Sequence, residues 1–195
     1  MQLRKVQKYI LEKLRNELPE NLTYHNADHT LDVFNAAESI ANAENVPIYE
    51  KKLLLTAALF HDSGFLKGRD EHEQESCRIA RRYLPGYNYS EDQIDLICGM
   101  IIATRIPQSP QTRLGEILCD ADLDYLGRDD FFVLSGKLFR ELCAEGLISD
   151  ENAWNLEQER FMENHSYYTE TSGKLRQGKK EEYINLVKSK ILNGS

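Results

Sequence analysis

The chain has 195 residues, of which 41% are hydrophobic and 29% are charged, and its formal net charge is −8. A chain of this length can bury a core of its own and is expected to form one domain. Its acidic residues are spread along the chain, which argues against an extended nucleic-acid surface or a polybasic membrane patch but leaves room for a local basic pocket.

Hydrophobic residues recur with the 3.6-residue period of an α-helix along nearly the whole chain, and no segment alternates as a strand would. Prolines, glycines and N-capping residues divide the pattern into segments. The expected helices are 3–18, 28–44, 47–63, 73–84, 91–102, 112–126, 129–145, 149–164 and 174–192. The last of them alternates Lys and Glu and is expected to be a solvated terminal arm. The sequence therefore predicts an all-α fold, a single compact domain of about eight or nine helices over residues 1–195.

Two further features of the sequence indicate the cellular compartment in which the protein is expected. No apolar run approaches the roughly 18 residues of a membrane span, and the N-terminus lacks the apolar segment of a signal peptide. The four cysteines are widely spaced without a CxxC pair, which suits a reducing environment. We expect a cytoplasmic protein without a membrane partner.

Three of the five histidines lie in two short segments at the edges of apolar helical stripes. His29 shares a helix face with Val33 and Ile40, and His61 follows the stripe of the next helix, with Asp62 about 100° further round. A buried imidazole or carboxylate needs polar partners, whereas such groups from two helices are what a divalent metal binds. One helix pair cannot surround an ion, so a further ligand is expected from a distant helix.

The best source of that ligand is the run from Asp120 to Asp124. Asp122 continues the inward stripe of its helix and is expected to be the buried acid, while Asp120 and Asp124 are expected to face elsewhere. An EF-hand calcium loop is excluded, because its sixth position is Tyr125 instead of Gly and its twelfth is Phe131 instead of Glu. A mixed nitrogen and oxygen set favours a transition metal over calcium.

His29, His61-Asp62 and Asp122, in this order, resemble the H…HD…D signature of the HD superfamily of metal-dependent phosphohydrolases. The resemblance covers about residues 24–127. It implies an HD-type domain with a motif-bearing core over that range and C-terminal helices in 129–195 that pack on it or extend it. It also implies that the four side chains hold a divalent metal ion (Mn, Fe, Ni, Co, Zn or Mg), either one ion or two.

The first motif, Tyr24-His25-Asn26 followed by His29, is similar to that of cyclic-nucleotide phosphodiesterases within the superfamily. Carried across, the resemblance makes His25 a candidate general acid and His29 a ligand. Asp62, beside the bound water in such a site, is a candidate for orienting it.

Two comparisons with the superfamily bear on metal count. His72 stands near the place where several branches bind a second metal or a substrate phosphate. Thr104 stands where relatives with two metals tend to have a His. Phe65 stands where relatives that cleave cyclic dinucleotides have a Lys. These two departures favour one tightly held metal.

Basic residues after these motifs are candidates for contacting substrate phosphate. Lys67 and Arg105 are the first candidates, and Arg69 and Arg113 are weaker alternatives. The polar-aromatic stretch 165–169 either forms a pocket wall that stacks a base or, as we expect, caps a helix and packs Tyr168 on the core.

The sequence therefore predicts a metal-dependent phosphohydrolase that cleaves a phosphoester of a nucleotide or another small phosphorylated metabolite, with cyclic nucleotides as one candidate. Two alternatives stay open. One is a regulatory module that binds metal and nucleotide without turnover. The other is a di-iron HD-type oxygenase, which would need an additional ligand set that includes His72. The sequence does not indicate an oligomeric state.

Overall fold

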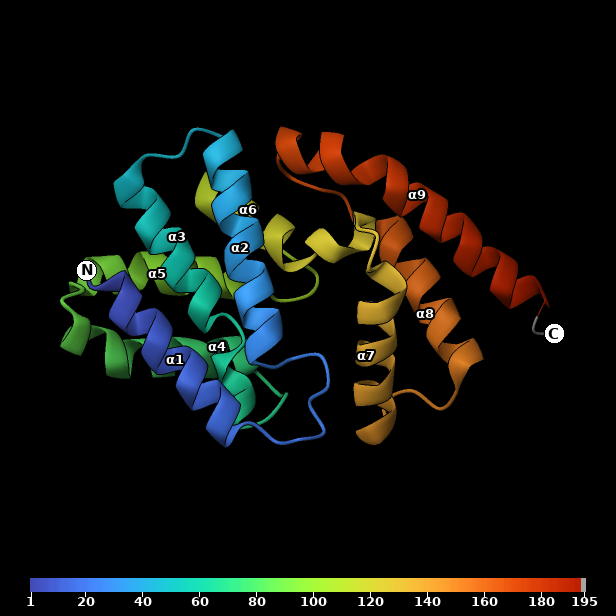
Figure 1. Ribbon diagram of the computed structural model, residues 1–195, viewed down its shortest axis with the longest axis horizontal. Helices are drawn as coiled ribbons and strands as arrows, with labels where there is room; N and C mark the ends of the chain where they lie inside the picture. Colours follow the sequence, from blue (N-terminus) through green and yellow to red (C-terminus); the bar gives the residue numbers. More distant parts are fainter. Residues whose placement is uncertain (194–195) are drawn as a thin grey trace. The chain divides into compact units, whose positions relative to one another are not determined.

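The computed structural model describes residues 1–193, and every regular element in that range is helical (Figure 1). This confirms the all-α prediction. Within residues 1–193 the α-helices are α1 (Leu3–Glu17), α2 (Ala27–Ala43), α3 (Ile48–Phe60), α4 (His72–Tyr83), α5 (Glu91–Ala103), α6 (Arg113–Asp122), α7 (Phe131–Ala144), α8 (Glu151–Asn164) and α9 (Glu170–Asn193). Short 3-10 helices follow three of them: η1 (Ser63–Leu66), η2 (Leu84–Tyr87) and η3 (Asp124–Gly127).

The helices form two compact units. Unit 1 comprises Met1–Pro19 and His25–Asp122 and contains α1 to α6, and unit 2 comprises Glu20–Tyr24 and the chain from Leu123 onward and contains α7 to α9. The expected domain boundaries, one domain over residues 1–195 with a core near 24–127, stay a prediction.

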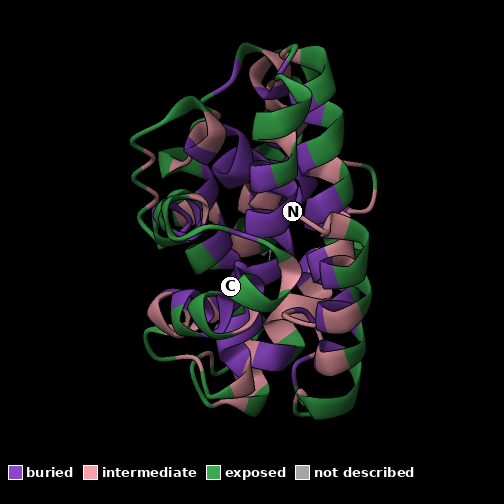
Figure 2. Ribbon diagram, turned by 90° about the vertical axis from the view of Figure 1, so that its left-hand side faces the viewer, coloured by how far each residue is buried: buried purple, intermediate pink, exposed green. Residues whose placement is uncertain are grey.

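The core of unit 1 is built around α3. Every residue from Leu53 to Phe60 is buried, and α3 contacts α1, α2, α5 and α6. A helix that is apolar on all sides is stable only inside a core, whereas the neighbouring helices bury one face each, as the purple and green sides of the ribbons in Figure 2 show. His61, the residue after α3, is therefore placed in the interior, with an exposed fraction of 0%.

The helix that carries His29 is fixed at its start by an N-cap. The Asn26 side chain accepts hydrogen bonds from the backbone N–H groups of Asp28 at 2.9 Å and His29 at 3.3 Å. Such a cap satisfies donors that the first turn of a helix leaves without partners. The position of His29 in the first turn of α2 is thus set locally by the Asn26 three residues before it.

Unit 2 packs around a second apolar cluster that includes Tyr24, Tyr125, Phe131, Tyr183 and Val187. The last two belong to α9, so the prediction of a solvated terminal arm is wrong. α9 packs along α8. Of the Lys and Glu residues that suggested a solvated arm, Glu181, Glu182 and Lys190 are exposed, whereas Lys180 is buried.

Two other expectations need correction. The helix expected over 112–126 ends at Asp122, because the chain turns there into η3. Tyr168, expected to pack on the core, has an exposed fraction of 41%, whereas the neighbouring Tyr167 is half-buried.

The contact between η1 and α4 leaves no room for a side chain at Gly64. A Cβ there would lie 1.9 Å from the carbonyl oxygen of His72. We therefore predict that Gly64→Ala lowers the free energy of unfolding by about 3 kcal/mol or more, since η1 and α4 must separate. Urea unfolding of the purified variant measures this loss.

Gly99 provides the matched control, because it lies within α5 and a Cβ there meets nothing within 4 Å. Gly99→Ala is expected to raise stability by roughly 0.5–1 kcal/mol through helix propensity. If Gly64→Ala were as stable as the wild type, the close packing of η1 on α4 would be wrong.

Candidate metal centre

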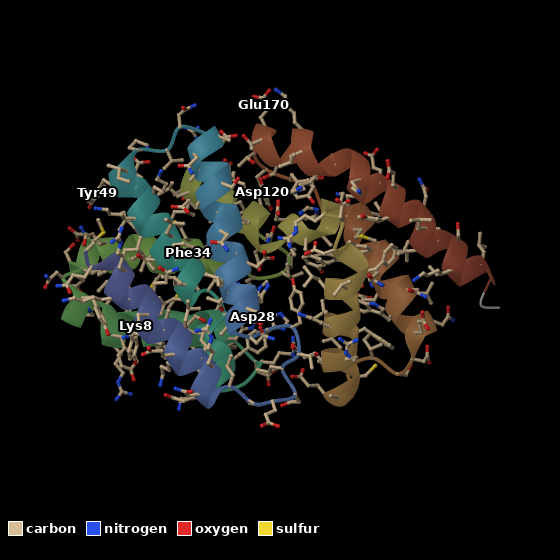
Figure 3. All side chains as sticks on the ribbon, viewed as in Figure 1. Lys8, Asp28, Phe34, Tyr49, Asp120 and Glu170 are labelled. Atoms are coloured by element: carbon tan, nitrogen blue, oxygen red, sulfur yellow. The ribbon has the colours of Figure 1, made fainter. Side chains whose placement is uncertain are left out.

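Three helices of unit 1 deliver the predicted ligands. His29 lies in the first turn of α2, His61 and Asp62 follow α3, and Asp122 is the last residue of α6. α2 packs against both α3 and α6. Figure 3 labels Asp28, the residue before His29 on α2, and Asp120, two residues before Asp122 on α6.

The four side chains converge on one point. The Nε2 atoms of His29 and His61 lie 3.3 Å apart. Asp62 Oδ2 lies 3.3 Å from His29 Nε2 and 3.2 Å from His61 Nε2, and Asp122 Oδ1 lies 3.3 Å from each of the two nitrogens. Three parts of the chain that are more than thirty residues apart in sequence, at His29, at His61-Asp62 and at Asp122, thus lie together in the structure.

The His61 ring is oriented by its surroundings. Its Nδ1–H donates to the carbonyl oxygen of Ala58 at 2.9 Å, so that the neutral ring presents the lone pair of Nε2 to the cluster. The backbone is held as well: Ser76 Oγ donates to the His61 carbonyl at 2.7 Å and accepts from Gly64 N–H at 2.8 Å. α4 therefore supports the site from behind through Ser76.

The electrostatics of the cluster favour charged carboxylates. Burial raises the pKa of Asp62 and Asp122, but the neighbouring imidazoles outweigh it, and the net effect lowers the pKa of Asp62 well below its usual value and that of Asp122 to about 2. Burial lowers the pKa of both histidines, but the two carboxylates outweigh it and raise the pKa of His29 and of His61. The site thus attracts positive charge, supplied by protons or by a metal ion that displaces them.

The spacing of the donor atoms fits a metal ion. Donor atoms of His29, His61 and Asp122 all lie within 4.8 Å of one another, so this cluster could hold a metal. Nitrogen and oxygen donors about 2.0–2.1 Å from a tetrahedrally bound ion lie about 3.3–3.4 Å apart, close to the 3.2–3.3 Å found between the side chains here. Two imidazoles and two carboxylates do not by themselves select one metal.

The acidic run around Asp122 differs from the expectation in one respect. Asp120 and Asp124, expected to face elsewhere, have exposed fractions of 0% and 5% and are buried. Asp124 belongs to unit 2, where its two carboxylate oxygens accept from Arg176 at 2.7 and 3.0 Å. The helical stripe identified Asp122 as inward-facing, but it could not indicate an arginine that lies 52 residues away.

His72 lies next to the cluster, at the start of α4. Its Nε2 lies 3.5 Å from Asp62 Oδ1 and 3.5 Å from Glu73 Oε1, while its Nδ1–H donates to the carbonyl of Arg69 at 3.0 Å. Glu73 is buried, with an exposed fraction of 6%, and sequence reasoning missed it. An acidic residue in the first turn of a helix is common for electrostatic reasons alone, so the sequence carried no separate signal for Glu73.

An aromatic contact links His25 and His72 to Phe65. The His25 ring stacks on Phe65 with centroids 4.4 Å apart, and the His72 ring lies 4.3 Å from Phe65. His25 also meets His29 edge-on at 5.8 Å. The structure therefore brings His25, the candidate general acid, beside the cluster. In the sequence, Phe65 was notable only because some relatives have a Lys at this position. In the structure its ring contacts the rings of both His25 and His72.

The predicted phosphate-contacting residues are less closely placed. Lys67 and Arg105 are both exposed, and no contact is found between either side chain and the four clustered residues. Arg113 pairs with Glu44 at 3.1 Å. Arg69, the weaker candidate, lies over the Phe65 ring at 5.1 Å.

The comparisons with known families agree with this geometry. A family model described as the HD domain matches residues 26–124, which is just over half of the chain. A relative from Clostridium beijerinckii, described as an uncharacterized protein, is 28% identical over 156 residues, covering 78% of this chain and 88% of its own.

Two solved structures share the fold. One is the crystal structure of a predicted HD superfamily hydrolase from an uncultured Thermotogales bacterium (TM-score 0.64, 21% identity, 96% of this chain and 92% of that chain covered). The other is Bacillus subtilis YpgQ in complex with ADP (TM-score 0.68, 20% identity, 97% of this chain and 95% of that chain covered).

Over the described residues, no helix combines the length and the apolar character needed to cross a bilayer.

The geometry leads to a prediction about metal affinity. Asp122→Asn keeps the size of the side chain but removes a charged donor, and it is expected to weaken Mn²⁺ binding by at least about 100-fold. Asp28→Asn is the matched control, since Asp28 is exposed and lies beside His29. Isothermal titration calorimetry of chelator-treated protein measures both affinities, and equal binding by the two variants would contradict the proposed cluster.

Proposed function

The chain belongs to the HD domain family, and from that premise we propose that it is a metal-dependent phosphohydrolase acting on a nucleotide or another small phosphorylated metabolite. The observation that carries the proposal is the convergence of His29, His61, Asp62 and Asp122 at 3.2–3.3 Å in unit 1. We propose that these four side chains hold one divalent ion. When bound, such an ion lowers the pKa of water and offsets charge on phosphoryl oxygens.

The remaining residues have separate proposed tasks. Asp62 directs Oδ2 toward the two histidines and Oδ1 toward His72, so it can accept a hydrogen bond from the attacking water and orient it. His25, stacked on Phe65, is the proposed acid that protonates the leaving oxygen. His72 is proposed to meet a phosphate oxygen or, with Glu73, a second ion.

The nucleotide part of the proposal has two supports. YpgQ, which shares the fold, is described as a complex with ADP. The segment Tyr24-His25-Asn26 resembles the first motif of cyclic-nucleotide phosphodiesterases. Phe65 in place of Lys argues against a cyclic dinucleotide. Lys67 and Arg105 are exposed. We propose that their positive charges attract an incoming phosphate group without binding it at a fixed position.

Turnover of a phosphoester panel tests the reaction. The panel contains nucleoside mono-, di- and triphosphates, cyclic nucleotides and p-nitrophenyl phosphate, each with Mn²⁺, Fe²⁺, Ni²⁺, Co²⁺, Zn²⁺ or Mg²⁺. We expect hydrolysis by the wild type and a loss of at least about 10³-fold in Asp122→Asn, because the variant lacks the charge that binds the ion. Metal and nucleotide binding without turnover would favour the regulatory module, and two irons per chain would favour the oxygenase.

The role of His25 is tested separately. His25→Gln removes the proton donor but no proposed metal ligand, so we expect kcat to fall about 10²–10⁴-fold while Mn²⁺ affinity stays within a few fold of the wild type. A variant with wild-type kcat would show that His25 is not the acid, while leaving the metal site untouched.

A further inference from the structure

Phe65 is a buried aromatic residue that belongs to neither apolar cluster. Its exposed fraction is 2%, yet the clusters found within residues 1–193 do not include it. The ring contacts found for it in the same range are with the imidazoles of His25 and His72 and with the guanidinium of Arg69. A phenylalanine that fills a core packs against other apolar side chains, so the ring of Phe65 is expected to serve the polar groups around it.

The backbone of Phe65 is held by the packing of η1. Its N–H donates to the carbonyl oxygen of Asp62 at 3.1 Å, which ties it to the segment that carries two of the four clustered side chains. The N–H of the preceding Gly64 donates to Ser76 Oγ at 2.8 Å, and the carbonyl of His72 leaves no room for a Cβ on Gly64. The ring of Phe65 is therefore a firmly placed surface beside the cluster.

His25 stands on less regular backbone. It lies in the non-helical segment before α2, and its side chain is half-buried. Its ring stacks on Phe65, with centroids 4.4 Å apart and planes 14° apart, and meets the His29 ring edge-on at 5.8 Å. One side of the imidazole thus rests on the fixed aromatic ring, while its edge approaches one of the clustered histidines.

Stacking restricts an imidazole in a way that apolar bulk alone does not. Two aromatic rings prefer an offset-stacked arrangement and gain free energy beyond the area that they bury. Beside an aliphatic side chain, the same imidazole has a broad choice of χ2 angles. The direction of its nitrogens matters for proton transfer, because a misplacement of about 1 Å can lower the rate of a reaction about 100-fold.

His72 depends less on the same ring. Its ring lies 4.3 Å from that of Phe65 and is tilted by 36°. In addition, its Nδ1–H donates to the carbonyl oxygen of Arg69 at 3.0 Å, and its backbone belongs to the first turn of α4. Of the two histidines that contact Phe65, His25 is therefore the one whose orientation we expect the ring to determine.

We propose that Phe65 is a positioning residue that holds the imidazole of His25 in its orientation beside the metal cluster. Phe65 touches no reacting atom and acts only through His25. The consequence for turnover rests on the function proposed above, in which His25 is the acid. The orientation of the His25 ring, however, is measurable in a protein that is not turning over.

The first measurement is the magnetic environment of His25 in the full-length chain with Zn²⁺, which is diamagnetic. Carbon-bound protons of a ring stacked on an aromatic face are shifted upfield, and His25→Gln assigns their signals in ¹H–¹³C spectra. Phe65→Leu, which keeps an apolar side chain without a ring, should move these signals downfield at both ends of a pH titration. Signals that coincide with those of the wild type would overturn the proposal. If Phe65→Leu does not fold, Phe65→Met is used in the same comparison.

The second measurement is a double-mutant cycle in turnover. Phe65→Leu is expected to lower kcat about 3- to 10-fold, the factor that corresponds to the free energy of one aromatic pair, with KM and Mn²⁺ affinity within a few fold of the wild type. Because Phe65 acts through His25, the double variant should have the kcat of His25→Gln alone. In a His72→Gln background, by contrast, Phe65→Leu should still lower kcat by the same factor.

Phe34→Leu is the matched control. Phe34, labelled in Figure 3, is a buried phenylalanine of α2 with no ring contact to His25 among the described residues, so both kcat and the His25 signals should stay unchanged. Losses in Phe65→Leu and His25→Gln that multiply in the double variant would show a general structural role for Phe65 and overturn the proposal. A wild type without turnover, or His25→Gln with wild-type kcat, would instead contradict the function proposed above, while the His25 signals would still decide the role of Phe65.

Discussion

The interior of unit 1 depends on one electrostatic requirement: two carboxylates and two imidazoles meet at a point where each needs positive charge or a proton from its neighbours. Asp62 and Asp122 face His29 and His61 at 3.2–3.3 Å, and no apolar packing would stabilise this arrangement. Its cost is offset by fixed partners, such as the Asn26 cap and the hydrogen bond of His61 to a backbone carbonyl. A divalent ion bound among them, as proposed above, would satisfy all four groups together.

Much of this could be predicted from the sequence because it depends on local periodicity. His29, His61 and Asp122 each continue an apolar stripe at a helix end, so their inward direction follows from the helix alone. Glu73 and Phe65 could not be predicted in the same way. Their roles depend on the packing of α4 and η1 at the site. This tertiary contact does not change the hydrophobic periodicity of either segment, so the sequence pattern does not indicate it.

The same limit explains the errors in unit 2. The Lys and Glu residues of α9 are typical of a solvated helix, yet Tyr183 and Val187 on the same helix enter a core. Lys180 is the sharpest case, because a lysine is expected at the surface and here it has an exposed fraction of 2%.

The central claim is that one divalent ion binds between the two histidines and the two aspartates of unit 1. Crystals grown with Mn²⁺ and measured at a wavelength where manganese scatters anomalously test it most directly. The account predicts one strong anomalous peak about 2.0–2.3 Å from His29 Nε2, His61 Nε2, Asp62 Oδ2 and Asp122 Oδ1. No peak among these atoms, with the four side chains still converging, would contradict it.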